Sequence, residues 1–206
     1  MTLRLNGATS GFTEIDAPAV AGSNTLVLPA SNGSAYQFLR NGATAGTTEF
    51  AGSITSGAAV ASTSGTSIDF TSIPSYVKRI TVMFSGVSTS GTSRYLVQIG
   101  AGSVTTSGYV GQSNATTAVI TVMSSGFMVL NNVTAANTHH GIVTLTLVGS
   151  NTWVESSIIA PATLSNYMGA SAGSVTLSGT LDRVRITTVN GTDAFDAGSI
   201  NILYEG

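Results

Sequence analysis

Charged residues are few in this sequence and cysteine is absent. Lys, Arg, Asp and Glu make up 8% of the 206 residues, against roughly 25% in an ordinary soluble domain. Without cysteine there are no disulfide bonds and no thiolate metal sites. The formal net charge of −2 and the lack of a basic stripe argue against nucleic-acid binding. We therefore expect no nucleic-acid partner.

Long apolar runs are also missing. No segment approaches the roughly 20 apolar residues of a membrane helix. The opening residues, MTLRLNG, lack the continuous apolar stretch of a secretion signal. We expect a protein that is made soluble in the cytosol and has no membrane partner.

Good helix formers are scarce, since the chain has one Lys and four Glu, whereas it has 28 Ser, 30 Thr and 24 Gly. A composition so rich in Gly and Ser is common in disordered chains. Here, however, 42% of the residues are hydrophobic, and they are grouped into short runs separated by turn residues, as β-strands require. The sequence predicts a folded all-β protein whose surface is covered by hydroxyl groups rather than charges.

Alternating side chains predict strands along residues 66–206. In RVRIT at 183–187, Val184 and Ile186 point one way and the arginines the other. Val143, Leu145 and Leu147 alternate with threonines in the same manner. Further predicted strands lie at 77–84, 95–99, 118–123, 127–130, 153–159, 175–177 and 200–204. So many short strands indicate a jelly-roll-like β-sandwich over 66–206.

The first 52 residues contain an internal repeat. NGATSGFTE at 6–14 returns as NGATAGTTE at 41–49, with seven of nine positions identical. Short strands joined by Asn-Gly turns are expected in each copy. Such thin repeats need neighbours on which to bury their apolar faces, and three copies of the chain around an axis would supply them. We expect residues 1–52 to form a thin oligomeric base or shaft, and residues 53–65 a flexible linker.

Two parts of the sequence resemble modules of bacteriophage virion proteins. TSIDFTSIPSYVKRITVMF at 66–84 and FDAGSINILY at 195–204 are similar to a β-sandwich module of phage tail-fibre and structural proteins. LRLNG at 3–7 and APAVAGSNTLVLP at 17–29 are similar to fibre repeats of tailed, cyanophage-like virions. The resemblance covers most of the chain and carries no catalytic motif. It implies a structural virion protein, assembled in the cytoplasm of a bacterial host.

From composition, repeat and resemblance together we expect a homotrimeric fibre and not an enzyme. Its predicted partners are further copies of itself, other virion proteins that bind residues 1–52, and a host-surface glycan. A tail fibre for host attachment is the first interpretation. A head fibre or capsid decoration protein, anchored through the N-terminal region, is the alternative.

Two tyrosines are candidate receptor contacts, because flat rings on loops can stack on sugars. Tyr109 in GYVG and Tyr167 in NYMG both stand in turn-like surroundings. Trp153 lies within a predicted strand, and we expect it in the core.

Other motifs do not indicate chemistry, and we predict no catalytic residue, no cofactor and no metal site. GASAG at 169–173 matches the serine-hydrolase pattern GxSxG, but no helix can follow it, so a glycine-rich loop is expected. His139 and His140 would face opposite sides of a strand. We expect solvated loop residues there, and a ring of histidines on an oligomer axis stays open. Asp193 and Asp196 are expected to form a turn into the last strand rather than a carboxylate pair acting on sugars.

Overall fold

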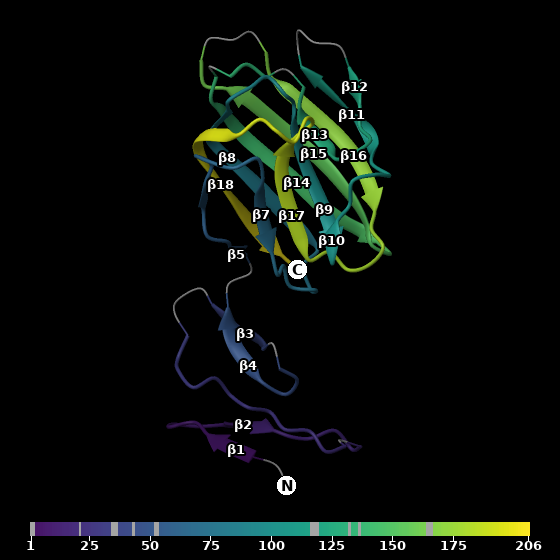
Figure 1. The fold of residues 1–206 in the computed structure, drawn as a ribbon. Helices are drawn as coiled ribbons and strands as arrows, with labels where there is room; N and C mark the ends of the chain where they lie inside the picture. The colour runs from purple at the N-terminus through teal and green to yellow at the C-terminus, as the bar shows by residue number, and fades with distance from the viewer. Residues whose placement is uncertain are drawn as a thin grey trace. The chain divides into compact units, whose positions relative to one another are not determined.

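The computed structural model describes residues 3–20, 22–33, 37–42, 44–51, 54–115, 120–131, 133–135, 137–163 and 167–206. The chain divides into two units, Met1–Ser53 and Ile54–Gly206, which we call the N-terminal unit and the head domain (Figure 1). None of the described residues is helical, so the prediction of an all-β protein is confirmed. The described part of the chain accordingly offers no helix that could cross a membrane.

Two antiparallel hairpins make up the regular structure of the N-terminal unit. Their strands are β1 (Leu3–Asn6) with β2 (Phe12–Ile15), and β3 (Phe38–Asn41) with β4 (Thr48–Ala51). Both loops begin at the repeated Asn-Gly, with the amide of Gly7 donating to Gly11 O and that of Gly42 to Thr47 O. The stretch 24–29, which lies between the two copies of the repeat, forms a single bridge, between Val27 and Thr47.

Each hairpin carries the same cross-strand ion pair. Arg4 faces Glu14 in the first, and Arg40 faces Glu49 in the second. Arg40 Nη2 lies 2.9 Å from Glu49 Oε1, and Arg4 Nε donates to Glu14 Oε1 at 2.6 Å. Both copies of the repeat therefore span the loop of a hairpin, but the strand register differs by one residue, since Asn6 faces Phe12 whereas Asn41 faces Thr48.

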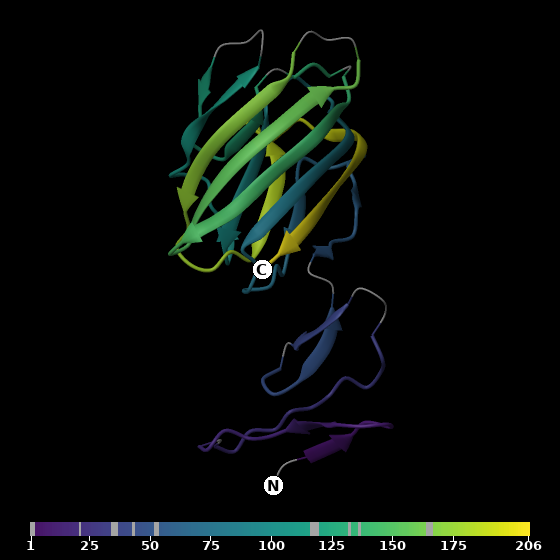
Figure 2. The same ribbon diagram turned by 180° about the vertical axis from the view of Figure 1, so that it is seen from behind.

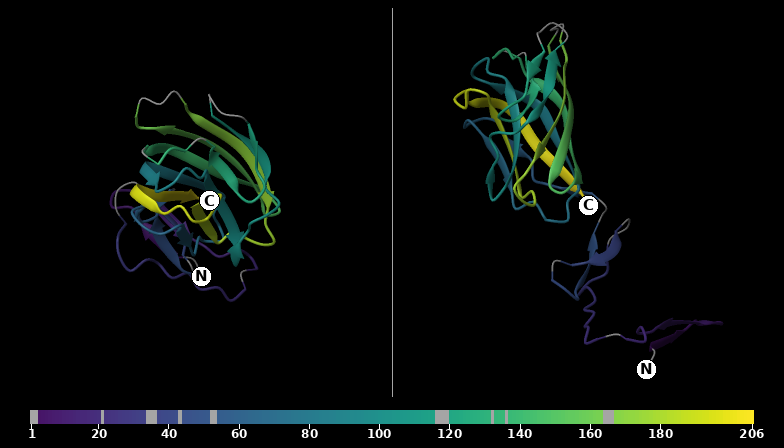
Figure 3. Two further views of the ribbon diagram at one scale, coloured as in Figure 1. Left: turned by 45° about the horizontal axis from the view of Figure 1, so that its top comes forward. Right: turned by 90° about the vertical axis from the view of Figure 1, so that its right-hand side faces the viewer.

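Two sheets build the head domain. The larger contains β5 (Thr55–Ser56), β6 (Val60–Ala61), β8 (Arg79–Thr89), β11 (Val110–Ala115), β12 (Thr121–Val122), β14 (His139–Gly149), β15 (Thr152–Pro161), β16 (Gly169–Thr176) and β18 (Phe195–Glu205). The smaller contains β7 (Ile68–Thr71), β9 (Tyr95–Ala101), β10 (Ser103–Val104), β13 (Phe127–Leu130) and β17 (Arg183–Thr188). They face each other as two layers (Figure 3).

The core lies between these layers and follows the predicted alternation. Val184 and Ile186 are buried on β17, as are Val143 and Leu145 on β14. Trp153 is buried as expected. The prediction of half-buried strands at these positions is confirmed. Of the strand predicted at 118–123, residues 118 and 119 lie outside the described residues, and β12 covers two of the others.

Strands mostly alternate between the sheets along the chain, but β14, β15 and β16 form a consecutive meander in the larger one (Figure 2). These three strands are hydrogen-bonded in the order in which they follow along the chain. A jelly-roll order of strands stays a prediction.

The linker expected at 53–65 is not a free linker. β5 and β6 pair with β18, and the Ser62 amide donates to Gly198 O at 2.9 Å. Ser62 itself is fully buried, and its hydroxyl donates to Ala197 O at 2.7 Å. The prediction was wrong because a Gly/Ser-rich composition does not reveal that backbone groups can complete the edge of β18.

Candidate functional site

Tyr109 belongs to the core and not to an exposed loop. Its side chain is 2% exposed, and its ring stands at 90° to that of Phe127, with centroids 4.8 Å apart. The hydroxyl accepts from the Ile99 amide at 2.9 Å and donates to Thr105 O at 3.1 Å. Burial raises the pKa of Tyr109 to about 12. The prediction of a receptor contact was wrong here, because the hydrogen bonds of this buried tyrosine join the loop after β10 to β9.

Tyr167 is half-buried, and its hydroxyl points inward. It lies 3.1 Å from His139 Nε2, while His139 Nδ1 lies 3.2 Å from both Val87 O and the Tyr95 hydroxyl. The Val87 carbonyl can only accept, so Nδ1 carries the proton and Nε2 accepts from Tyr167. A receptor contact through the remaining surface of this ring stays a prediction.

His139 is fully buried, which corrects the expectation of a solvated loop histidine. Burial lowers its pKa, and the hydrogen bond to Val87 O opposes that shift only in part. His140 points to the opposite side of β14 and is exposed, as strand geometry requires. Its Nδ1 accepts from the Gly86 amide at 3.2 Å. The two rings therefore cannot share a ligand.

The GxSxG motif forms part of strand β16, which corrects the expectation of a glycine-rich loop. Gly169 and Gly173 face the interior, where a Cβ would come within 2.7 Å of Leu130 Cδ1 and 2.8 Å of Met123 Sδ. At Gly173 a Cβ would also come within 2.7 Å of the backbone oxygen of Val110, so glycine favours the close pairing of β11 with β16 there. The motif thus arises from packing and not from nucleophilic chemistry.

Ser171 of this motif takes part in a buried polar cluster with Glu155 and Ser157. Its hydroxyl donates to Glu155 Oε1 at 2.8 Å and lies 2.5 Å from Ser157 Oγ. Glu155 is 3% exposed, and its Oε2 has no partner among the described residues. Burial raises the pKa of Glu155 to about 7, although the serine hydroxyls lower it in part. Burial of this kind disfavours the charged form of a carboxyl group.

Asp193 and Asp196 have separate structural tasks. Asp193 Oδ2 accepts from the Ser93 amide at 2.8 Å, and its Oδ1 accepts from Asn190 Nδ2 at 2.6 Å. Asp196 stands in β18 and accepts from the Ser88 hydroxyl. Asp193 holds the turn that enters the last strand, as predicted. Across the described residues no group of three His, Cys, Asp or Glu side chains could hold a metal ion.

A polar hollow of about 320 Å³ lies on the outer side of β9 and β17, and we call it the β9–β17 hollow. Leu96 and Val189 supply apolar walls, while Gln98, Arg185 and Thr187 supply polar groups. Its volume is at the lower end of the roughly 300–1,000 Å³ range of small-molecule sites. Sequence reasoning missed it, because its residues come from segments far apart in the chain.

Hydrogen bonds fix the polar side chains of this hollow in place but leave some of their donor and acceptor atoms available to a ligand. Gln98 Nε2 donates to Ser125 O at 2.7 Å, which is the only hydrogen bond of that side chain to the described residues. Arg185 Nε and Nη2 donate to the two oxygens of Asp69 at 2.7 and 3.2 Å. The amide oxygen of Gln98 and Arg185 Nη1 remain to accept and donate. Because Asp69 balances Arg185, the site suits a neutral polyhydroxylated ligand better than an acid.

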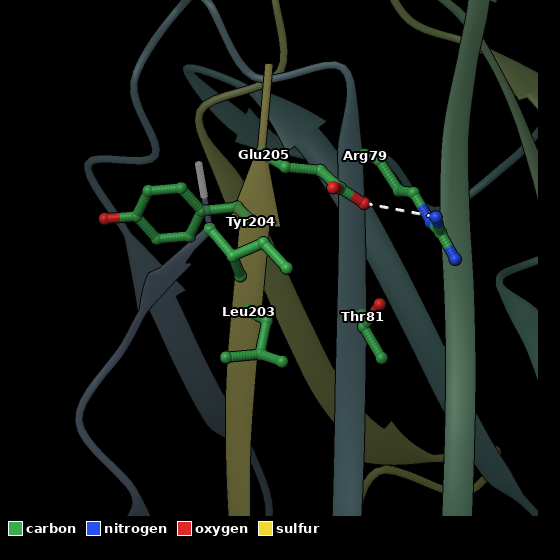
Figure 4. Close-up of a pocket in the computed structure, with 6 residues that line it drawn as sticks. Arg79, Thr81, Leu203, Tyr204 and Glu205 are labelled. Atoms are coloured by element: carbon green, nitrogen blue, oxygen red, sulfur yellow. Dashed lines mark ion pairs between the residues drawn. The ribbon is translucent and has the colours of Figure 1, made fainter. Parts of the chain in front are cut away.

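A second, smaller hollow of about 170 Å³ lies where β5 meets β18 (Figure 4). Leu203 and Thr81 stand side by side on neighbouring strands, and Arg79 Nη1 lies 3.2 Å from Glu205 Oε1. Arg79 and Glu205 neutralise each other, and the volume of the hollow is below that of most ligand sites. This hollow does not indicate a ligand.

Comparison with protein-family models, curated proteins and solved structures finds no match to this chain.

Proposed function

We propose that this protein is an oligomeric, non-enzymatic fibre component of a tailed-phage virion, in which the N-terminal unit joins three copies and the head domain binds the host surface. The observation that carries the proposal is the lack of burial in the N-terminal unit. None of the described residues of the N-terminal unit is buried, although eleven of its large hydrophobic side chains are exposed, among them Val20 at 93% and Leu28 at 66%.

A unit with this exposure cannot be stable as a single copy. Isolated two-stranded hairpins are at best marginal in water, and contiguous exposed apolar surface marks an interaction site. In the first hairpin Leu3, Leu5 and Ile15 share one face, while Arg4 and Glu14 occupy the other. Further copies of the same chain would cover the apolar face, in keeping with the preference of oligomers for closed symmetry.

Host attachment is assigned to the β9–β17 hollow rather than to the tyrosines. Its combination of one amide, one guanidinium nitrogen and hydroxyl groups between apolar walls fits a neutral sugar, since each sugar hydroxyl both donates and accepts. A single small site binds weakly, and three copies on one fibre raise the overall affinity by avidity.

The proposed place in the virion can be tested by immunogold electron microscopy with an antibody against this chain. Particles produced from the genome that encodes it should carry gold on the tail. Gold distributed over the head would instead indicate a capsid decoration protein. Particles without gold would contradict the proposed function.

Sugar binding by the hollow should depend on Gln98 and Arg185. Saturation-transfer NMR with neutral monosaccharides should detect binding of at least one of them to the wild-type protein. Gln98→Leu and Arg185→Met should each abolish the signal. Arg183→Met is the matched control. Arg183 lies on β17 like Arg185 and donates two hydrogen bonds to a carboxylate, that of Asp182, but it does not line the hollow. Equal signals from all variants would contradict sugar binding by the β9–β17 hollow.

A further inference from the structure

Charge is distributed very unevenly over the head domain. From Tyr95 to Leu181 the sequence contains one Asp, Glu, Lys or Arg residue. That residue, Glu155, is buried. Strands β9 to β16 therefore contribute no formally charged side chain to the described surface. The ten other charged residues of the head domain come from segments before β9 and after β16.

The outer face of four of these strands forms a regular uncharged grid. Cross-strand register aligns three rows over β14, β15, β16 and β11. The rows are Ile142, Ile158, Ala170 and Asn114; Thr144, Ser156, Ala172 and Gln112; and Thr146, Val154, Ser174 and Val110. We call these twelve positions the uncharged face. The first charges beside it are Arg79 and Glu205, at one corner, and they pair with each other.

Apolar exposure is concentrated in the same part of the head domain. Of its twelve exposed large hydrophobic side chains, eight lie between Val110 and Met168. Ile142 and Ile158, at 51% and 55% exposure, stand next to each other in the grid. A shallow hollow of about 600 Å³ adjoins them, and Gly141 also lines it. Among the described strands of the head domain, none covers β14, β15 and β16 from outside (Figure 2).

We infer that the uncharged face packs against a second copy of the head domain. The inference rests on the proposed oligomer, which tethers several heads through one N-terminal assembly. Depletion of charge is typical of interface cores and not of solvated surfaces. In a threefold assembly the uncharged faces of the three heads can turn toward the common axis, where no like charges meet and repel at a cost of several kcal/mol. Their Ala, Ser and Thr side chains are small enough for neighbouring heads to approach closely.

Because the chain has no cysteine, single thiols can report which face is covered. Ser156→Cys places a thiol at the centre of the grid, where the side chain is exposed in a single copy. Thr71→Cys is the control, on the outer side of β7 and also exposed. Maleimide labelling rates are measured on the full chain, and again in a Leu5→Asp background that carries a charge on the apolar face of the first hairpin.

In the native oligomer the thiol of Ser156→Cys should label roughly tenfold more slowly than in the Leu5→Asp background, a change that corresponds to about 1.4 kcal/mol of protection. The thiol of Thr71→Cys should label at the same rate in both. Equal rates for Ser156→Cys, in a sample that light scattering shows to be oligomeric, would overturn the inference and leave the proposed assembly standing. A monomeric wild-type protein would contradict both.

Discussion

Replacing Glu155 by Gln should stabilise the head domain by about 3 kcal/mol at pH 8, while leaving its stability at pH 4 nearly unchanged. Burial raises the pKa of Glu155 from about 4.5 to about 7, and each pKa unit corresponds to about 1.4 kcal/mol. Between these values the folded state binds more protons than the unfolded state, so the free energy of unfolding falls as pH rises. Glutamine keeps the shape of the neutral acid and cannot ionise.

Urea denaturation of both proteins from pH 4 to pH 8 measures this effect. The wild-type protein should lose stability relative to Glu155→Gln across that window, with the difference levelling off above pH 7. The difference between the two free energies of unfolding removes contributions that both proteins share. One of these is that of His139, whose lowered pKa makes stability rise with pH instead of fall. Glu205→Gln is the control, because an exposed ion pair contributes roughly 0–1 kcal/mol. A difference that does not vary with pH would show that the Glu155 carboxyl is solvated.

Leu5→Asp should dissociate the proposed trimer without unfolding the head domain. Leu5 lies next to Leu3 on the apolar face of the first hairpin, diagonally across from Ile15. Covering it in an assembly would contribute roughly 2 kcal/mol per copy, and three buried carboxylates near one axis would repel one another. The matched control is Asn6→Asp, which adds the same charge one residue further on, to the opposite face. Size-exclusion chromatography should show a smaller species for Leu5→Asp alone, with an unchanged thermal transition of the head domain.

The fold class follows from the sequence because alternation is a local signal. RVRIT at 183–187 shows which side chains enter the core, and the structure places Val184 and Ile186 there. The same alternation of buried and exposed side chains, with its period of two residues, also applies to residues next to the apolar ones used for the prediction. Counting back from Leu145 and Val143 in steps of two reaches His139, and counting on from Trp153 reaches Glu155 and Ser157. All three are buried, so a stronger use of the pattern would have found both polar clusters.

Other features depend on contacts between distant segments and could not be predicted. Tyr109 stands in the turn-like sequence GYVG, yet its ring packs on Phe127 and its hydroxyl accepts a hydrogen bond from the Ile99 amide. GASAG at 169–173 is a strand because neighbouring strands pair with both of its edges. The β9–β17 hollow combines Gln98, Ser125 and Arg185, which no local pattern relates.

The most direct test is the molar mass of the purified 206-residue protein by light scattering. The exposed apolar side chains of the N-terminal unit predict three times the 20.7 kDa of one chain, stable on dilution into the micromolar range. A monodisperse 20.7 kDa species would contradict the proposed fibre.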